Sequence, residues 1–85
     1  MAEDVRKQVG RNVRRLRIAA GLSQAELAER MGVDRAYVRG LELGLRNPTI
    51  LSLWHVAEAL NVEVRSLFQK TSARRPIIER KSLKL

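Results

Sequence analysis

The segment QAELAERMGVDRAYVRGLEL, residues 24–43, constrains the fold more than any other part of the chain. It contains two short stretches with helical spacing of apolar residues, separated by a break that begins at Gly32. Glycine reaches the left-handed backbone conformation that a sharp turn between two helices requires. Ala28 is small, so it lets the two predicted helices approach each other closely. The apolar wedge between them is predicted to contain Leu27, Met31, Val33, Val38 and Leu41.

Cap residues predict where the helices begin and end. Ser23 precedes Glu26 by the spacing of a capping box, in which each side chain satisfies a free backbone N–H. Asp34 and Thr49 are good N-caps for a third and a fourth helix, and Asn61 can end the fourth. Residues 1–68 show no alternating pattern of useful length, so no strand is predicted there.

Apolar spacing predicts which residues are buried. A first helix that ends at Gly21 is predicted to bury Val5, Val9, Val13, Leu16 and Ala20. The fourth helix is predicted to bury Ile50, Leu53, Val56, Ala57 and Leu60. A short fifth helix or turn would then close the core with Val62, Val64, Leu67 and Phe68.

The chain is strongly basic. Seventeen Lys and Arg against nine Asp and Glu give a net charge of +8, which favours polyanionic partners, nucleic acid first and an anionic membrane surface second. Residues 69–85 contain six basic residues and one acid and lose the helical spacing, so they are predicted to form a basic tail. Charge alone indicates no sequence specificity.

Composition also excludes several classes of function. The chain has no cysteine and one histidine, His55, so we expect no metal site, no cofactor and no catalytic triad. No stretch approaches the ~20 apolar residues that span a membrane, and the amino terminus lacks the apolar run of a signal peptide. We therefore expect an intracellular protein that is not an enzyme and has no membrane partner.

Three segments occur in order within residues 9–68, namely VGRNVRRLRIAAGLSQAELAERMGV, LELGLRNPT and VAEALNVEVRSLF. Together they resemble the phage-repressor-like (XRE, Cro-repressor type) family of bacterial helix-turn-helix DNA-binding regulators. The resemblance implies an all-α domain of five packed helices over residues 1–68, followed by the tail. It implies a cytoplasmic protein of a bacterium or phage that binds an inverted-repeat operator as a homodimer, with the third helix in the major groove. It also implies transcriptional control, with repression as the expected output.

The resemblance assigns roles to individual positions. Base contacts are expected from Arg35, Ala36, Arg39 and Gly40. Phosphate contacts are expected from Gln24, Tyr37, Arg46, Asn47 and Arg17. Structural roles are expected for Gly32, Ala28 and Glu42, with Glu42 joined to Arg17 so that the first helix is tied to the end of the third. Arg17 is expected to keep guanidinium donors for a phosphate.

The physical chemistry of the residues supports these roles unevenly. Arg35 and Arg39 are four residues apart, so they project from one face of a helix, and arginine fits the guanine edge in the major groove. Gly40 weakens a helix by roughly 0.5–1 kcal/mol, which close approach to DNA would explain. The alternatives are two solvent-facing arginines and a glycine that is merely tolerated.

A homodimer contact is expected from Leu51, Trp54, Asn61 and Val62, although Trp54 could instead pack in its own core. The tail has three interpretations: a basic arm on phosphates, a dimerisation segment, or a segment that binds a partner protein. Two alternatives to a simple repressor follow. One is an antitoxin that silences a toxin and represses its own promoter, and the other is a basic adaptor between proteins.

Overall fold

A computed structural model of the chain describes residues 4–70, which form four α-helices and one 3-10 helix. The α-helices are α1 (Val5–Ala19), α2 (Gln24–Met31), α3 (Arg35–Glu42) and α4 (Ile50–Leu60), and the 3-10 helix is η1 (Val64–Phe68). The prediction of an all-α fold without strands holds for residues 4–70, but the fifth helix is a single short 3-10 segment. The predicted tail lies outside the described residues except for Gln69 and Lys70, so the domain boundary stays a prediction.

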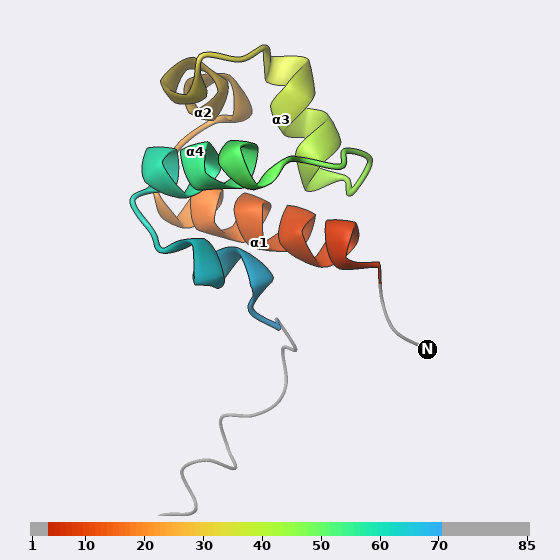
Figure 1. Ribbon diagram of the computed structural model, residues 1–85. Helices are drawn as coiled ribbons and strands as arrows, with labels where there is room; N and C mark the ends of the chain where they lie inside the picture. The colour runs from red at the N-terminus through yellow and green to blue at the C-terminus, as the bar shows by residue number, and fades with distance from the viewer. Residues whose placement is uncertain (1–3, 71–85) are drawn as a thin grey trace, which may run out of the picture.

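Figure 1 shows α1 and α4 crossing the middle of the molecule, with α2 and α3 on one side and η1 on the other. The helix pairs α1–α3, α2–α3, α1–η1 and α2–α4 are in contact. One apolar core lies between them and contains Val9, Val13, Leu27, Ala28, Val38, Leu41, Leu53, Val56, Ala57, Leu60 and Leu67. These include residues from all five elements, so each helix depends on the others for burial of its apolar face.

All four α-helices end in the same way. A residue in the left-handed region follows each last turn, with φ of 76° at Gly21, 73° at Gly32, 76° at Gly44 and 59° at Asn61. The next residue then donates its N–H to a carbonyl five positions back, as Leu45 does to Gly40 at 2.9 Å. This is the Schellman arrangement, which satisfies the free carbonyls of a helix end. The predicted helix ends at Gly21, Gly32 and Asn61 are confirmed.

The predicted N-cap residues Ser23, Asp34 and Thr49 all precede the first residue of a helix, and two of them cap it through the side chain. Ser23 and Glu26 form a complete capping box, and the Thr49 hydroxyl accepts from the Ser52 N–H at 3.0 Å. Asp34 is the N-cap of α3 as predicted, but its side chain makes no capping hydrogen bond. Its backbone carbonyl accepts from the Tyr37 N–H at 2.9 Å instead.

Several residues that were predicted to be buried lie on the surface. The exposed fractions are 52% for Val5, 87% for Ile50, 37% for Val33 and 42% for Phe68, and Ala20 is also exposed. Val5, Ala20 and Ile50 lie at helix ends, where no neighbouring element continues far enough to cover them. Val33 lies in the turn between α2 and α3 rather than in the wedge.

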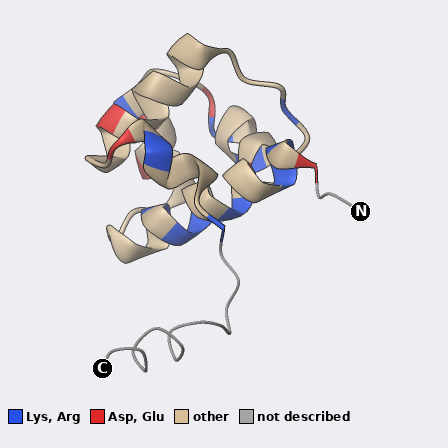
Figure 2. Ribbon diagram, turned by 60° about the horizontal axis from the view of Figure 1, so that its bottom comes forward, with Lys and Arg blue, Asp and Glu red and all other residues tan. Residues whose placement is uncertain are grey.

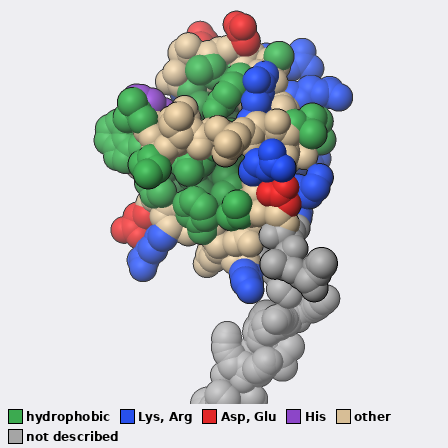
Figure 3. Space-filling view, turned by 45° about the vertical axis from the view of Figure 1, so that its right-hand side comes forward, with side chains coloured by type: hydrophobic (Ala, Val, Ile, Leu, Met, Phe, Trp, Pro, Cys, Tyr) green, Lys and Arg blue, Asp and Glu red, His purple; other side chains and the backbone are tan. Residues whose placement is uncertain are grey.

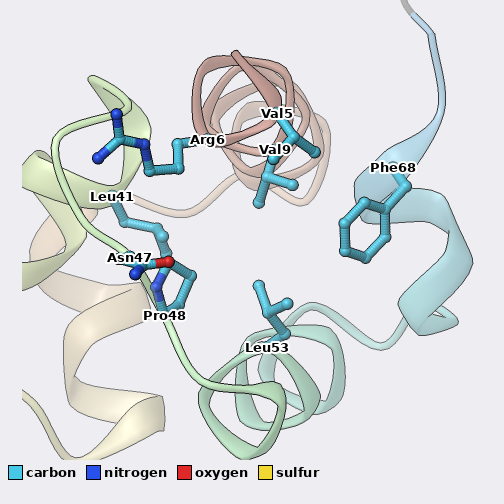
Figure 4. A pocket seen from close by; sticks show the side chains of 8 residues that line it. All are labelled: Val5, Arg6, Val9, Leu41, Asn47, Pro48, Leu53 and Phe68. Atoms are coloured by element: carbon cyan, nitrogen blue, oxygen red, sulfur yellow. The ribbon is translucent and has the colours of Figure 1, made fainter.

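Val5 and Phe68 have a partial role in packing because they border a small apolar pocket of about 180 Å³. Figure 4 shows their side chains with those of Val9, Leu41, Leu53 and three neighbours, contributed by α1, α3, α4, η1 and the α3–α4 loop. The pocket marks the place where the ends of these elements meet without filling the space between them.

Two buried residues of α1 that spacing did not single out hold other elements in place. Gly10 faces α3 so closely that a Cβ atom would lie 2.5 Å from the carbonyl oxygen of Leu41. Asn12 is fully buried, and its Nδ2 donates to the carbonyls of Leu67 at 2.8 Å and Gln69 at 2.7 Å. Gly10 thereby sets the distance from α1 to α3, and Asn12 fixes the end of η1 on α1.

We expect Gly10→Ala to lower the free energy of unfolding by about 1–3 kcal/mol, the usual cost of overpacking. The added methyl would meet backbone carbonyls of α3, which cannot rotate away as a side chain can. The gain in helix propensity of roughly 0.5–1 kcal/mol offsets only part of this cost. Urea unfolding followed by circular dichroism measures the change, and an unchanged or higher midpoint would contradict the close approach.

Candidate nucleic-acid interface

A buried carboxylate fixes the orientation of α3 relative to α1 and α2. Glu42, 7% exposed, accepts from Arg17 Nε at 2.6 Å and from Arg17 Nη2 at 3.1 Å. It also accepts from Gln24 Nε2 at 3.0 Å. The last turn of α3 is thus bonded to the body of α1 and to the first residue of α2. The predicted pairing of Arg17 with Glu42 is confirmed.

The same geometry places most of the Arg17 guanidinium inside the protein, while its phosphate role stays a prediction. Its side chain is 11% exposed, and its third nitrogen, Nη1, donates to the carbonyl of Leu22 at 2.8 Å. Three of the five N–H donors of the guanidinium therefore bond inside the protein, and Arg17 joins α1 to α3 and to the residue Leu22 before α2. Gln24 is half-buried and donates its amide nitrogen to Glu42, at the start of α2, where the first backbone N–H groups have no partner within the helix.

The opposite face of α3 is open to solvent. Val38, Leu41 and Glu42 are buried, whereas Arg35, Ala36 and Arg39 are exposed. Basic residues occur on several elements (Figure 2), so charge alone does not single out α3. Arg35 and Arg39 form no hydrogen bond or ion pair with any part of residues 4–70, as is also true of Arg14 on α1. By contrast, Arg17, Arg30 and Arg65 each hydrogen-bond to the protein itself. What distinguishes Arg35 and Arg39 is that they lie together on the exposed face of α3, whose orientation is fixed by buried Glu42.

Arg46 reaches back from the α3–α4 loop onto α3. Its guanidinium carbon lies 5.1 Å from the centre of the Tyr37 ring, within the range of a cation–π contact. Its stem lies against Gly40, where a Cβ atom would be 2.9 Å from Arg46 Nε. Arg46 and Arg39 line a shallow hollow of about 340 Å³, together with Ala36, Gly40, Leu43 and Leu45. The structure therefore brings Arg39, Gly40, Tyr37 and Arg46 together.

The remaining predicted residues are placed as follows. Asn47 is exposed beside Arg46 in the same loop. Gly32 has φ of 73° and ends α2, and Ala28, 3% exposed, lies in the core where α2 packs on α3 and α4, as predicted. Gly40 faces Arg46 rather than open space, so the structure gives this glycine a partner that the sequence did not indicate.

A second exposed surface lies on α4. Leu51 is 63% exposed and Trp54 is 46% exposed, and the rings of Trp54 and His55 meet edge to face at 5.4 Å. Figure 3 shows hydrophobic side chains gathered beside the single histidine. Ile50 also belongs to this surface, although the sequence spacing predicted that Ile50 is buried in the core. Of the other residues predicted for a dimer contact, Asn61 is exposed, and Val62 is half-buried against the core.

Comparison with known proteins agrees with this geometry. The family model described as helix-turn-helix matches residues 13–67, which include α2, α3, α4, η1 except for Phe68, and α1 from Val13 onward. The chain belongs to the helix-turn-helix family. Within it, α2 and α3 are the two helices of the motif, joined by the turn at Gly32.

Relatives within the helix-turn-helix family are named as transcriptional regulators and control proteins. The regulator y4dJ from Sinorhizobium fredii is 48% identical over 59 residues, covering 69% of this chain and 77% of the relative. The control protein C.SmaI from Serratia marcescens is 37% identical over 67 residues, covering 79% and 80%. The crystal structure of the restriction-modification controller protein C.AhdI from Aeromonas hydrophila matches with a TM-score of 0.72 at 44% identity, covering 74% of this chain and 96% of that one.

These matches identify the protein as a helix-turn-helix transcriptional regulator, of a DNA-binding family whose members are not enzymes. It is related to the controller proteins of restriction-modification systems. Within residues 4–70, no helix is long and apolar enough to cross a membrane. The same residues contain no cluster of three His, Cys, Asp or Glu side chains that could hold a metal ion.

Proposed function

We propose that this protein binds duplex DNA at a specific operator, with α3 in the major groove. The observation that carries the proposal is the pair of exposed arginines on α3, Arg35 and Arg39, which form no hydrogen bond or ion pair within residues 4–70. The buried side of the same helix is fixed by Glu42. A guanidinium without an internal partner can donate two hydrogen bonds to guanine O6 and N7. A fixed helix keeps the spacing of the two arginines constant, which sequence-specific recognition requires.

Contacts to the DNA backbone would come from both ends of the motif. Gln24 opens α2, where the free N–H groups and the positive end of the helix dipole favour a phosphate. Arg46 and Asn47 follow α3 in an exposed loop and would contact the phosphates of the DNA strand across the major groove from Gln24. Tyr37 could add its hydroxyl. The net charge of +8 supports this arrangement because phosphate neutralisation supplies much of the affinity of such proteins.

The proposal includes a homodimer on an inverted repeat. The exposed apolar surface of Ile50, Leu51 and Trp54 is the kind of patch that a second copy would cover, with Asn61 and Val62 at the other end of α4 as the further predicted contacts. A two-fold dimer must present both copies of α3 to one face of the duplex, so half-sites should lie about 34 Å apart. Bound at a promoter, such a dimer would repress by excluding polymerase.

The test is selection of bound duplexes from a random library with the full-length protein at physiological salt. We expect enrichment of a short inverted repeat that contains guanines in each half-site. In the same experiment, Leu51→Asp should select single half-sites, because a carboxylate in place of Leu51, which is 63% exposed, would oppose the dimer contact. The control is Ile18→Asp on α1, which should still select the inverted repeat. Binding without any enrichment would refute specific recognition and favour the antitoxin or adaptor alternative.

A further inference from the structure

Gly40 occupies a position in α3 where its own backbone does not require glycine. The positive-φ glycines in residues 4–70 are Gly21, Gly32 and Gly44, whereas Gly40 has ordinary helical geometry. A helix interior favours alanine over glycine, so an unforced glycine needs another reason. The reason on this surface is steric, because the place that a side chain would occupy is already filled. A Cβ atom would lie 2.9 Å from Nε, 3.3 Å from Cγ and 3.6 Å from Cδ of Arg46.

Arg46 is exposed, but its side chain lies against α3 at its stem and at its guanidinium. At its base, the Leu45 N–H donates to the Gly40 carbonyl at 2.9 Å, which brings the loop backbone against α3. Its stem then crosses Gly40, and its guanidinium lies over the ring of Tyr37 at 5.1 Å. Tyr37 and Gly40 are three residues apart and therefore lie on one face of the helix. Glycine at one position and an aromatic ring at the other together accommodate a long cationic side chain.

We propose that Gly40 and Tyr37 form a seat for Arg46 and that Gly40 is a positioning residue for DNA binding, an inference that rests on the proposed function. In the seat, Arg46 stands on the exposed side of α3 and lines one hollow with Arg39 and Ala36. A free arginine has many rotamers and loses them when it binds, which reduces affinity. Arg46 loses part of this freedom before DNA arrives. Gly40 thus acts on DNA through Arg46 rather than by direct contact.

The free protein tests the seat without DNA. In the wild type, the side-chain protons of Arg46 should show an upfield ring-current shift in NMR spectra because they lie over Tyr37. Gly40→Ala should abolish this shift, since the new methyl displaces the stem. In the same substitution the gain in helix propensity and the loss of the cation–π contact are of similar size, so Tm should change little. Gly10→Ala is the matched control, because there the methyl meets backbone and Tm should fall.

A double-mutant cycle on the selected duplex tests the effect on DNA binding. We expect Gly40→Ala to weaken binding by about fivefold, comparable to loss of one cation–π contact, with little change in Tm. Arg46→Ala should weaken binding at least as much. The double variant should bind no more weakly than Arg46→Ala alone, because no Arg46 side chain is left to displace. Tyr37→Phe should keep the ring-current shift, and Tyr37→Leu should lose it.

Two results would overturn the proposal. One is an unchanged Arg46 shift in Gly40→Ala, which would mean that no seat exists. The other is an equal loss of affinity from Gly40→Ala with and without Arg46, which would mean that DNA approaches Gly40 directly. Failure of the proposed function gives a different pattern: the ring-current shift responds to Gly40→Ala as expected, but the wild type enriches no duplex. In that case the seat stands and its role in DNA binding is refuted.

Discussion

Glu42→Ala should lower the free energy of unfolding by about 3–5 kcal/mol, the usual cost of leaving one member of a buried ion pair unpaired. Arg17 would keep its charge in a site where its side chain is only 11% exposed, with Leu22 as its one remaining partner. Gln24 would lose the acceptor for its amide at the same time. Guanidinium chloride unfolding followed by circular dichroism measures the loss.

The chain offers a matched control for this experiment. Arg65 and Glu63 form an ion pair with the same 2.6 Å separation, but their side chains are 86% and 71% exposed. Because solvent screens exposed pairs, we expect Glu63→Ala to change stability by less than about 1 kcal/mol. Equal effects at the two sites would show that the carboxylate of Glu42 does not hold α1, α2 and α3 together.

Removing the two exposed arginines of α3 should abolish sequence discrimination while leaving weak binding. Each guanine contact that is lost costs about 1–3 kcal/mol of specificity, so Arg35→Ala with Arg39→Ala should reduce preference for the selected duplex by roughly two orders of magnitude or more. Folding should be unaffected, because neither side chain bonds to residues 4–70. Competition of the selected duplex against a scrambled one at several salt concentrations measures both the sequence preference and the salt-dependent binding that remains.

The loss of two charges alone must be separated from the loss of two base contacts. Arg65→Ala with Lys70→Ala removes the same charge from η1 and the residues after it, away from α3. This control should weaken binding to both duplexes similarly, since only the salt-dependent attraction to phosphate changes. If the α3 variant also kept its full preference for the selected duplex, the assignment of α3 to the groove would be wrong.

Local features of the fold could be predicted from the sequence because their causes lie within a few residues. The capping box of Ser23 and Glu26 and the left-handed turn at Gly32 each depend on a single backbone segment. The buried pairing of Arg17 with Glu42 was also predicted, but from family resemblance, since the two residues are 25 positions apart. Exposure of Arg35 and Arg39 followed from helical spacing.

Features that depend on tertiary contacts were missed or wrong. In the sequence, Gly10 is only a residue of low helix propensity. The structure shows that the carbonyl of Leu41 lies too close to Gly10 for a side chain. Asn12 lies in a segment with three arginines in the sequence, and its partners are 55 and 57 residues away. Spacing treated Ile50 and Leu53 alike, but only Leu53 has an element packed over it. The partner of Gly40 is Arg46, which lies in a loop, and apolar periodicity does not predict the path of a loop.

The division of α3 into a bonded face and an unbonded face has an evolutionary consequence. Val38, Leu41 and Glu42 are buried in the interior, whereas the side chains of Arg35, Ala36 and Arg39 are exposed and form no hydrogen bond or ion pair within residues 4–70. Descendants of this chain can therefore exchange those three side chains and acquire new target sites while inheriting an intact scaffold. Gly40 is not equally exchangeable, because any larger residue there also moves Arg46. Substitutions that change the preferred DNA target should therefore be frequent at positions 35, 36 and 39 and rare at position 40.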